Sequence, residues 1–401
     1  MKDYNIFNDF GNENEDDLLQ KINSFDEAVI WGTDWTTETI TNQLLRKNID
    51  LFPKFQRRDA WSRIAKSKFI ESLILGLPIP QIILAEKKDE KGKYIVIDGK
   101  QRLLTIRQFF AQDENDEFKH FRLTGLEVLS SLNKKSFDDI KQNPEFNQVL
   151  NSLYNQTIRT TVIKNWPNEE FLFTVFLRLN TGSIKLSPQE LRQALHPGPF
   201  IDYADSFSIE SDAIKKMLNL RQPDYRMRDV EMVIRYFTYK LFIEQYDGNL
   251  KRAFDNTVKV LNDNWDLEEN RILRESQNLE NAISFTNETF GSREAFSKWS
   301  DGRFQGNFNR AIFDIMVYYF SIPNILNKLQ DKKEQIVEAF KLKCENDPDF
   351  ISSFEHTTKS ITNTGKRYTT WGEELANILN EKIQIPQIVE NRLVLKNSQN
   401  G

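Results

Sequence analysis

The sequence has one cysteine and three histidines among its 401 residues, too few for several common kinds of site. Cys344 has no second cysteine for an intramolecular disulfide, and a structural zinc site needs several thiolate or imidazole ligands. Because His120, His196 and His356 are far apart in the sequence, an HNH-type nuclease site is not expected. Catalysis by a thiol is not expected either.

Long apolar stretches are also missing. The longest uncharged stretch, residues 72–85, is shorter than the roughly 20 residues that cross a bilayer, and it contains two prolines. The N-terminus lacks the basic and apolar regions of a secretory signal. No Gly-x-x-x-x-Gly-Lys-Ser/Thr loop and no Gly-x-Ser-x-Gly elbow is present, which excludes P-loop NTPases and α/β-hydrolases. We therefore expect a cytoplasmic protein without membrane association.

Large apolar side chains are plentiful, since 39% of residues are hydrophobic and 30 are phenylalanine. The chain can therefore build real cores, and its length allows two or three domains. Charge is distributed unevenly. Residues 1–45 hold two Lys against ten acidic residues, whereas residues 46–108 hold fifteen Lys and Arg against seven acidic residues. The basic segment can meet phosphate, or the acidic start can be a solvated tail; charge alone leaves both readings open.

The pattern of apolar residues predicts an α+β protein. Residues 1–28 form an acidic, flexible segment, residues 29–200 a mixed α/β domain, and residues 201–401 a helical domain. In the second segment we expect helices over 36–47 and 62–75, the latter burying Ile64, Phe69, Leu73 and Ile74, then a hairpin of strands 81–85 and 94–97. A strand over 157–163 and a helix over 168–179 follow. In the last segment we expect helices near 227–245, 249–264, 307–320, 329–345 and 371–381.

The most informative motif is Asp98-Gly99-Lys100-Gln101-Arg102, which joins the strand ending at Ile97 to a helix. A glycine turn of this kind exposes backbone N–H groups at the positive end of a helix dipole, which favours bound phosphate. Lys100 and Arg102 can add charged contacts, and Asp98 can accept from a ribose or hold Mg²⁺. The alternative is structural, because Asp98 and Gln101 also have the spacing of a helix capping box.

Two further clusters allow either a functional or a structural reading. Gln56, Arg57 and Arg58 lie between aromatic residues, and the arginines suit either phosphate contacts or ion pairs with Asp59 and Glu71. Asn180 precedes Thr181-Gly182 at the expected end of a helix. Further on, Ser187-Pro188-Gln189-Glu190 predicts a helix start with Ser187 as the cap and Glu190 completing a capping box.

In combination, the ordered motifs over residues 30–200 resemble the N-terminal domain of GmrSD-type modification-dependent restriction endonucleases, which is related to ParB and sulfiredoxin. The resemblance rests on Phe55-Gln56-Arg57-Arg58, Lys68-Phe69-Ile70-Glu71-Ser72, Gly76-Leu77-Pro78-Ile79-Pro80, Asp98-Gly99-Lys100-Gln101-Arg102-Leu103 and Leu179-Asn180-Thr181-Gly182 with Leu186-Ser187-Pro188-Gln189-Glu190-Leu191. Lys100 stands where the family's Asp-Gly-Gln-Gln-Arg motif has its first glutamine. The histidines of the family's HNH-like domain are missing from the C-terminal half.

The resemblance implies a ParB-like fold that binds and hydrolyses a nucleoside triphosphate with Mg²⁺. It assigns nucleotide binding to Gln56, Arg57, Arg58, Asp98, Gly99, Lys100, Gln101, Arg102 and Asn180, with Asp98, Arg102 and Arg57 as catalytic residues and Asp98 as a metal ligand. The expected role is a component of a prokaryotic restriction or anti-phage system. Its expected partners are the nucleotide, DNA, a partner nuclease subunit and further copies of this chain.

Two other functions are compatible with the sequence. The chain can be a stand-alone DNA nickase or nuclease with a ParB-like site, although we find no metal-carboxylate cluster in the sequence. It can also be a non-catalytic DNA-binding scaffold, for which Arg303, Arg310, Lys366 and Arg367 offer a local basic strip unless they are scattered surface charges.

Overall fold

A computed structural model describes residues 28–49, 51, 60–111, 116, 118–169, 171–172, 174–175 and 187–399. The described residues divide into two compact units, 28–195 and 196–399, each with its own buried apolar residues. The acidic segment expected over residues 1–28 lies outside the described residues except for Ala28. Of the helix expected over residues 168–179, the structure describes residues 168–169, 171–172 and 174–175, and all of these except residue 168 are helical. The remaining six residues lie outside the described ranges.

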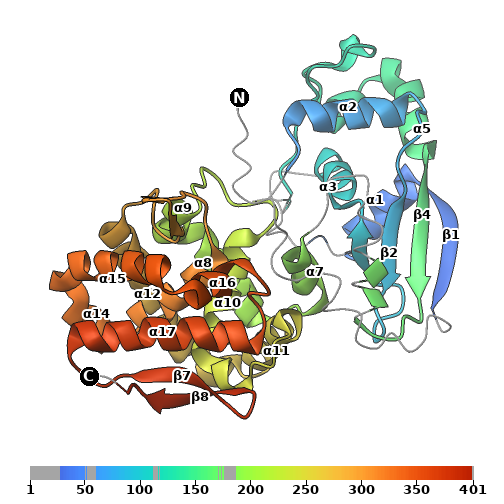
Figure 1. Cartoon of the computed structure of the whole chain (residues 1–401). Helices are drawn as coiled ribbons and strands as arrows, with labels where there is room; N and C mark the ends of the chain where they lie inside the picture. Colours follow the sequence, from blue (N-terminus) through green and yellow to red (C-terminus); the bar gives the residue numbers. More distant parts are fainter. Residues whose placement is uncertain are drawn as a thin grey trace. The chain divides into compact units, whose positions relative to one another are not determined.

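In the described part of the first unit, four strands form one mixed sheet (Figure 1). Their order is β1 (Val29–Thr36), β4 (Thr157–Lys164), β2 (Ile82–Glu86) and β3 (Tyr94–Asp98). β4 runs antiparallel to β1 and parallel to β2, while β2 and β3 form the predicted hairpin. Both the hairpin and the predicted strand over 157–163 are therefore confirmed.

Helices cover both faces of this sheet, because alternate residues of each strand point to opposite sides. On one face Ile82, Leu84 and Val96 join a core formed with residues of α1 (Thr37–Leu45), α2 (Arg63–Ile74), α3 (Lys100–Phe109), α4 (Phe137–Lys141) and α5 (Asn147–Asn155). On the other, Ile83, Ile95 and Ile97 pack with Leu191 of α7 (Pro188–Leu195). The predicted helices at α1 and α2 are confirmed, but Ile64 is 52% exposed and does not join the buried side of α2.

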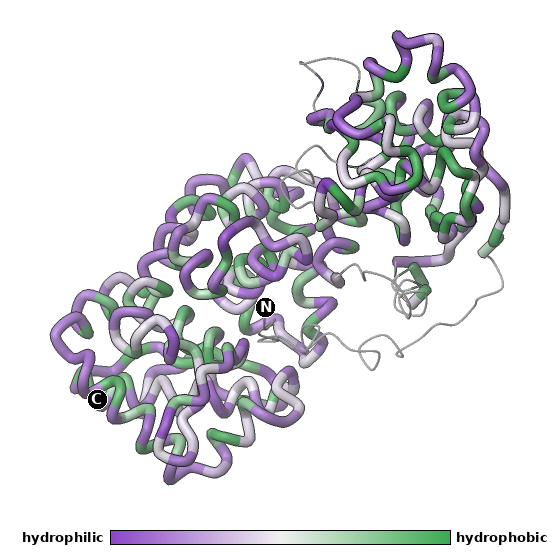
Figure 2. The backbone as a smooth tube through the Cα atoms, turned by 90° about the horizontal axis from the view of Figure 1, so that it is seen from above, coloured by the Kyte–Doolittle hydropathy of each residue, from purple (hydrophilic) through white to green (hydrophobic). Residues whose placement is uncertain are grey.

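The second unit is mainly helical, as predicted, and its helices are amphipathic, with hydrophobic residues recurring between hydrophilic ones along the chain (Figure 2). It contains α8 (Pro199–Glu210), α9 (Asp212–Met217), α10 (Arg228–Phe242), α11 (Leu250–Asp263), α12 (Trp265–Phe290), α13 (Arg310–Phe320), α14 (Pro323–Leu329), α15 (Lys333–Asn346), α16 (Pro348–Glu355) and α17 (Ile361–Leu379). The sequence missed the longest of them, α12, and placed the start of α17 ten residues too late.

Two short antiparallel hairpins complete this unit: β5 (Trp299–Ser300) with β6 (Arg303–Phe304), and β7 (Gln384–Val389) with β8 (Arg392–Asn397). The second hairpin lies against α17 at two glycines. A Cβ atom on Gly372 would collide with Tyr319 and Ile385, so glycine allows the close approach. The chain is α+β, and none of its described helices is long and apolar enough to cross a bilayer.

Candidate functional site

The candidate site begins with a tight turn at the end of β3. Gly99 has a φ of +98°, a left-handed conformation that other residues adopt at a cost, and it is the N-cap of α3. A Cβ atom at this position would lie 3.1 Å from Cγ1 of Ile82 on the neighbouring strand. A shift in register between β2 and β3 pairs Asp98 with Ile83 next to this turn. Both the backbone angle and the close strand therefore require glycine here.

The turn sets the direction of α3 and the position of its first amides. The first backbone hydrogen bond of the helix runs from Leu103 N to Gly99 O at 3.0 Å. A helix cannot pair the N–H groups of its first turn with its own carbonyl groups, so they point outward at the positive end of the dipole. No side-chain cap is formed, which shows that the capping-box reading of Asp98 and Gln101 was wrong. Asp98 ends β3 instead.

Asp98 and Arg102 form an ion pair across this first turn. Nη2 of Arg102 donates to Oδ2 of Asp98 at 2.8 Å. The Arg102 side chain is 8% exposed and that of Asp98 21% exposed, so the carboxylate is the more accessible partner. The pair fixes the guanidinium beside the first amides of α3, where it can add charge-assisted contacts to an anion.

Lys100 makes a contact that links two segments far apart in the sequence. Its Nζ donates to Oε1 of Glu190 on α7 at 2.7 Å, and both side chains are nearly fully buried. Glu190 also accepts from Ser187 N at 2.7 Å, while Glu190 N donates to Oγ of Ser187 at 3.1 Å. The predicted capping box at Ser187 is thus confirmed. The same carboxylate holds the start of α7 beside the start of α3.

Sequence reasoning identified Glu190 as a capping residue but missed its ion pair with Lys100. The available signal was the lysine that replaces the family's glutamine, because a buried ammonium requires a carboxylate partner. Sequence reasoning also missed the buried polar side chains of Gln189, Arg192 and Gln193 on α7. Nη1 of Arg192 donates to Oε1 of Gln189 at 2.8 Å.

The structure brings together five of the predicted site residues, Asp98, Gly99, Lys100, Gln101 and Arg102. The others, Gln56, Arg57, Arg58 and Asn180, lie outside the described residues. Within the described ranges no group of three or more His, Cys, Asp or Glu side chains is arranged to hold a metal ion. In this part of the chain a Mg²⁺ ion at Asp98 would have one carboxylate ligand, and phosphate oxygens or water would complete its coordination.

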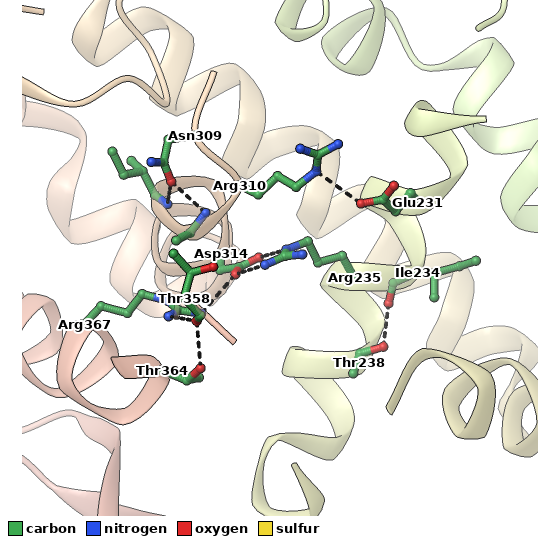
Figure 3. Close-up of polar contacts among 12 residues, drawn as sticks. Glu231, Ile234, Arg235, Thr238, Asn309, Arg310, Asp314, Thr358, Thr364 and Arg367 are labelled. Atoms are coloured by element: carbon green, nitrogen blue, oxygen red, sulfur yellow. Dashed lines mark hydrogen bonds and ion pairs between the residues drawn. The ribbon is translucent and has the colours of Figure 1, made fainter. Parts of the chain in front are cut away.

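A second polar cluster is buried in the helical unit (Figure 3). Asp314 on α13 accepts hydrogen bonds from Arg235 on α10, at 2.7 Å for Nη2, and from Nη2 of Arg367 on α17 at 3.4 Å. Nε of Arg310 donates to Oε1 of Glu231 at 3.2 Å. The proposed basic strip was therefore wrong, because Arg367 is fully buried and Arg310 is paired.

The comparisons with known proteins agree with the geometry of the first unit. Residues 41–197, less than half of the chain, match the family model described as GmrSD restriction endonuclease, N-terminal domain. This range contains the Gly99 turn, the Asp98–Arg102 pair and the start of α7. No curated protein and no solved structure matches the chain.

Proposed function

We propose that this chain binds and hydrolyses a nucleoside triphosphate within a prokaryotic restriction or anti-phage system, since residues 41–197 match the N-terminal domain of GmrSD restriction endonucleases. It would act in the cytoplasm with DNA or with a partner nuclease subunit. The observation that carries the proposal is the turn at Gly99, which presents the first amides of α3 beside Arg102. Helix starts of this kind bind phosphate.

Each residue of the motif has a distinct part in this proposal. The backbone N–H groups of residues 100–102 donate to phosphate oxygens, and the Arg102 guanidinium adds positive charge beside them. Asp98 is the accessible carboxylate and would hold Mg²⁺, which when bound with the nucleotide neutralises phosphate charge. The Lys100 ammonium faces Glu190, so its side chain positions α7 while its backbone contributes to the phosphate site.

Residues outside the described ranges keep their predicted roles. Arg57 is proposed to neutralise charge that develops during phosphoryl transfer, with Gln56 and Arg58 beside it in the sequence. Asn180 is proposed to contact the same nucleotide. Association with DNA and with a partner nuclease is proposed from the restriction family of the domain.

Isothermal titration with ATP, GTP, CTP and UTP in the presence of Mg²⁺ tests the nucleotide site. We expect the wild type to bind at least one of them and Arg102→Ala to lose binding, because a charge-assisted contact to phosphate disappears. Arg159→Ala is the matched control, since Arg159 is an exposed arginine of the same unit whose side chain pairs with Asp34. Its affinity should equal that of the wild type.

Two results would count against this function. Unchanged affinity in a folded Arg102→Ala variant would remove Arg102 from the site. Binding of none of the four nucleotides, together with a steep salt dependence of DNA binding, would favour the scaffold alternative. Phosphate release from the nucleotide that binds then decides whether the site also hydrolyses it.

A further inference from the structure

On the two helices that the Lys100–Glu190 pair joins, three side-chain atoms are buried without a hydrogen-bond partner. They are Oε1 of Gln101, Nε2 of Gln189 and Oε1 of Gln193. Within the described part of residues 28–195, no other buried side-chain nitrogen or oxygen lacks a partner. Buried polar atoms are nearly always paired because leaving them unpaired costs free energy, so a cluster of three requires an explanation.

These atoms belong to residues at the start of α3 and on α7. Gln101 follows Lys100 at the start of α3, and Gln189 precedes Glu190 on α7. Gln193 is one helical turn beyond Gln189, so the two side chains lie on the same side of α7. Since Lys100 and Glu190 are in contact at 2.7 Å, the helix starts that carry the three amides lie side by side.

The hydrogen bond between Gln189 and Arg192 identifies which atom of the Gln189 side-chain amide is unpaired. Oε1 of Gln189 accepts from Nη1 of Arg192, and arginine can only donate, so the unpaired atom of this amide is the donor Nε2. Gln193 instead leaves an acceptor, Oε1. Helix α7 therefore offers one donor and one acceptor, both neutral, on residues one turn apart.

This pattern suits a nucleobase and not a phosphate group. Phosphate oxygens need donors or positive charge, and an unpaired amide oxygen would repel them. The edge of a nucleobase carries both donors and acceptors, and glutamine side chains pair with such edges. Each of the two α7 amides could thus be satisfied by the same planar ring.

We infer that Gln189 and Gln193 recognise the base of the nucleotide whose phosphates bind at the start of α3. This inference rests on the proposed nucleotide site and adds the residues that would set base preference. In this arrangement Nε2 of Gln189 donates to the base edge and Oε1 of Gln193 accepts from it. The buried Lys100–Glu190 pair holds the helix that carries them beside the phosphate site.

The test compares ATP, GTP, CTP and UTP with inorganic tripolyphosphate, each with Mg²⁺, by isothermal titration. Gln189→Met and Gln193→Met keep the size of the side chain and remove its amide. We expect each variant to bind the preferred nucleotide about tenfold more weakly, as for one lost hydrogen bond, with unchanged affinity for tripolyphosphate. Gln142→Met, an exposed glutamine of the same unit, should change neither affinity.

Thermal unfolding without ligand separates recognition from a purely structural role. Removing the amide of Gln193 should leave the Tm unchanged or raise it, whereas a structural amide would lower it. Gln189→Met is not used for this measurement, because it also removes the acceptor of Nη1 of the buried Arg192 and should lower the Tm for that reason. The inference is overturned if both variants keep the wild-type ratio of nucleotide to tripolyphosphate affinity, or if Gln193→Met lowers the Tm. If the wild type binds neither nucleotide nor tripolyphosphate, the proposed function itself has failed.

Discussion

At the scale of single residues, the left-handed backbone conformation of Gly99 sets the geometry of the candidate site. The sequence identified this glycine because a strand, a glycine turn and a helix follow one another. It could not show that a Cβ atom at this position would lie only 3.1 Å from Cγ1 of Ile82, because that contact depends on the pairing of two strands. A side chain at position 99 should therefore destabilise the fold in two ways, through the left-handed backbone and through the short distance to Ile82.

Gly99→Ala should therefore destabilise the first unit by more than the roughly 1–2 kcal/mol of a left-handed non-glycine residue. Gly92→Ala is the matched control, because Gly92 has a φ of +79° but no heavy atom within 4 Å of its Cβ position. Urea unfolding of both variants measures the difference. Equal destabilisation would show that Ile82 does not restrict the turn.

Folding should lower the reactivity of the Cys344 thiol. Burial raises the pKa of this thiol to about 12, so it is protonated in the folded protein at neutral pH. Native protein should not react with iodoacetamide at pH 8, while urea-unfolded protein should. Because the folded pKa exceeds the unfolded value, stability should fall as the pH rises from about 9 towards 12. Rapid labelling of the native protein at pH 8 would contradict this account.

At the scale of helices and strands, local patterns predicted most of the first unit. The hairpin, the strand β4, the helices α1 and α2 and the cap at Ser187 all followed from apolar periodicity and turn residues. The ion pair of Lys100 with Glu190 could not be predicted in the same way, because it joins residues 90 positions apart. The 26-residue helix α12 was missed although Gly291 ends it, because in its first half only Ile272 and Ser276 are buried and the apolar periodicity there is weak.

The three helices α10, α13 and α17 are joined by the cluster around Asp314. Burial alone would lower the pKa of Arg235, but the Asp314 carboxylate outweighs it and raises that pKa above its usual value. Asp314→Asn leaves two buried arginines without their shared carboxylate, so we expect a loss of about 3–5 kcal/mol of unfolding free energy. Asp349→Asn, at an exposed pair with Lys366, should cost about 1 kcal/mol or less in the same urea experiment. Equal effects would contradict the buried role of Asp314.

At the scale of the whole molecule, the two units differ in the evidence for function that they carry. The first carries the family match and the motif residues, while the second is mainly helical and pairs Arg310 and the buried Arg235 with its own carboxylates. The sequence predicted this division of α/β and helical parts from composition and periodicity. It could not predict which arginines of the second unit are exposed, since burial depends on how distant helices pack.

Hydrogen–deuterium exchange of the full chain, with and without Mg²⁺ and each of ATP, GTP, CTP and UTP, tests the central claim most directly. The amides of residues 100–102 belong to a first helical turn, which has no acceptors within its own helix, so bound phosphate should slow their exchange. We predict that the nucleotide that binds slows exchange in residues 99–103 and at the start of α7, and leaves the helical unit unchanged. Nucleotide binding with no protection at residues 99–103 would contradict the account.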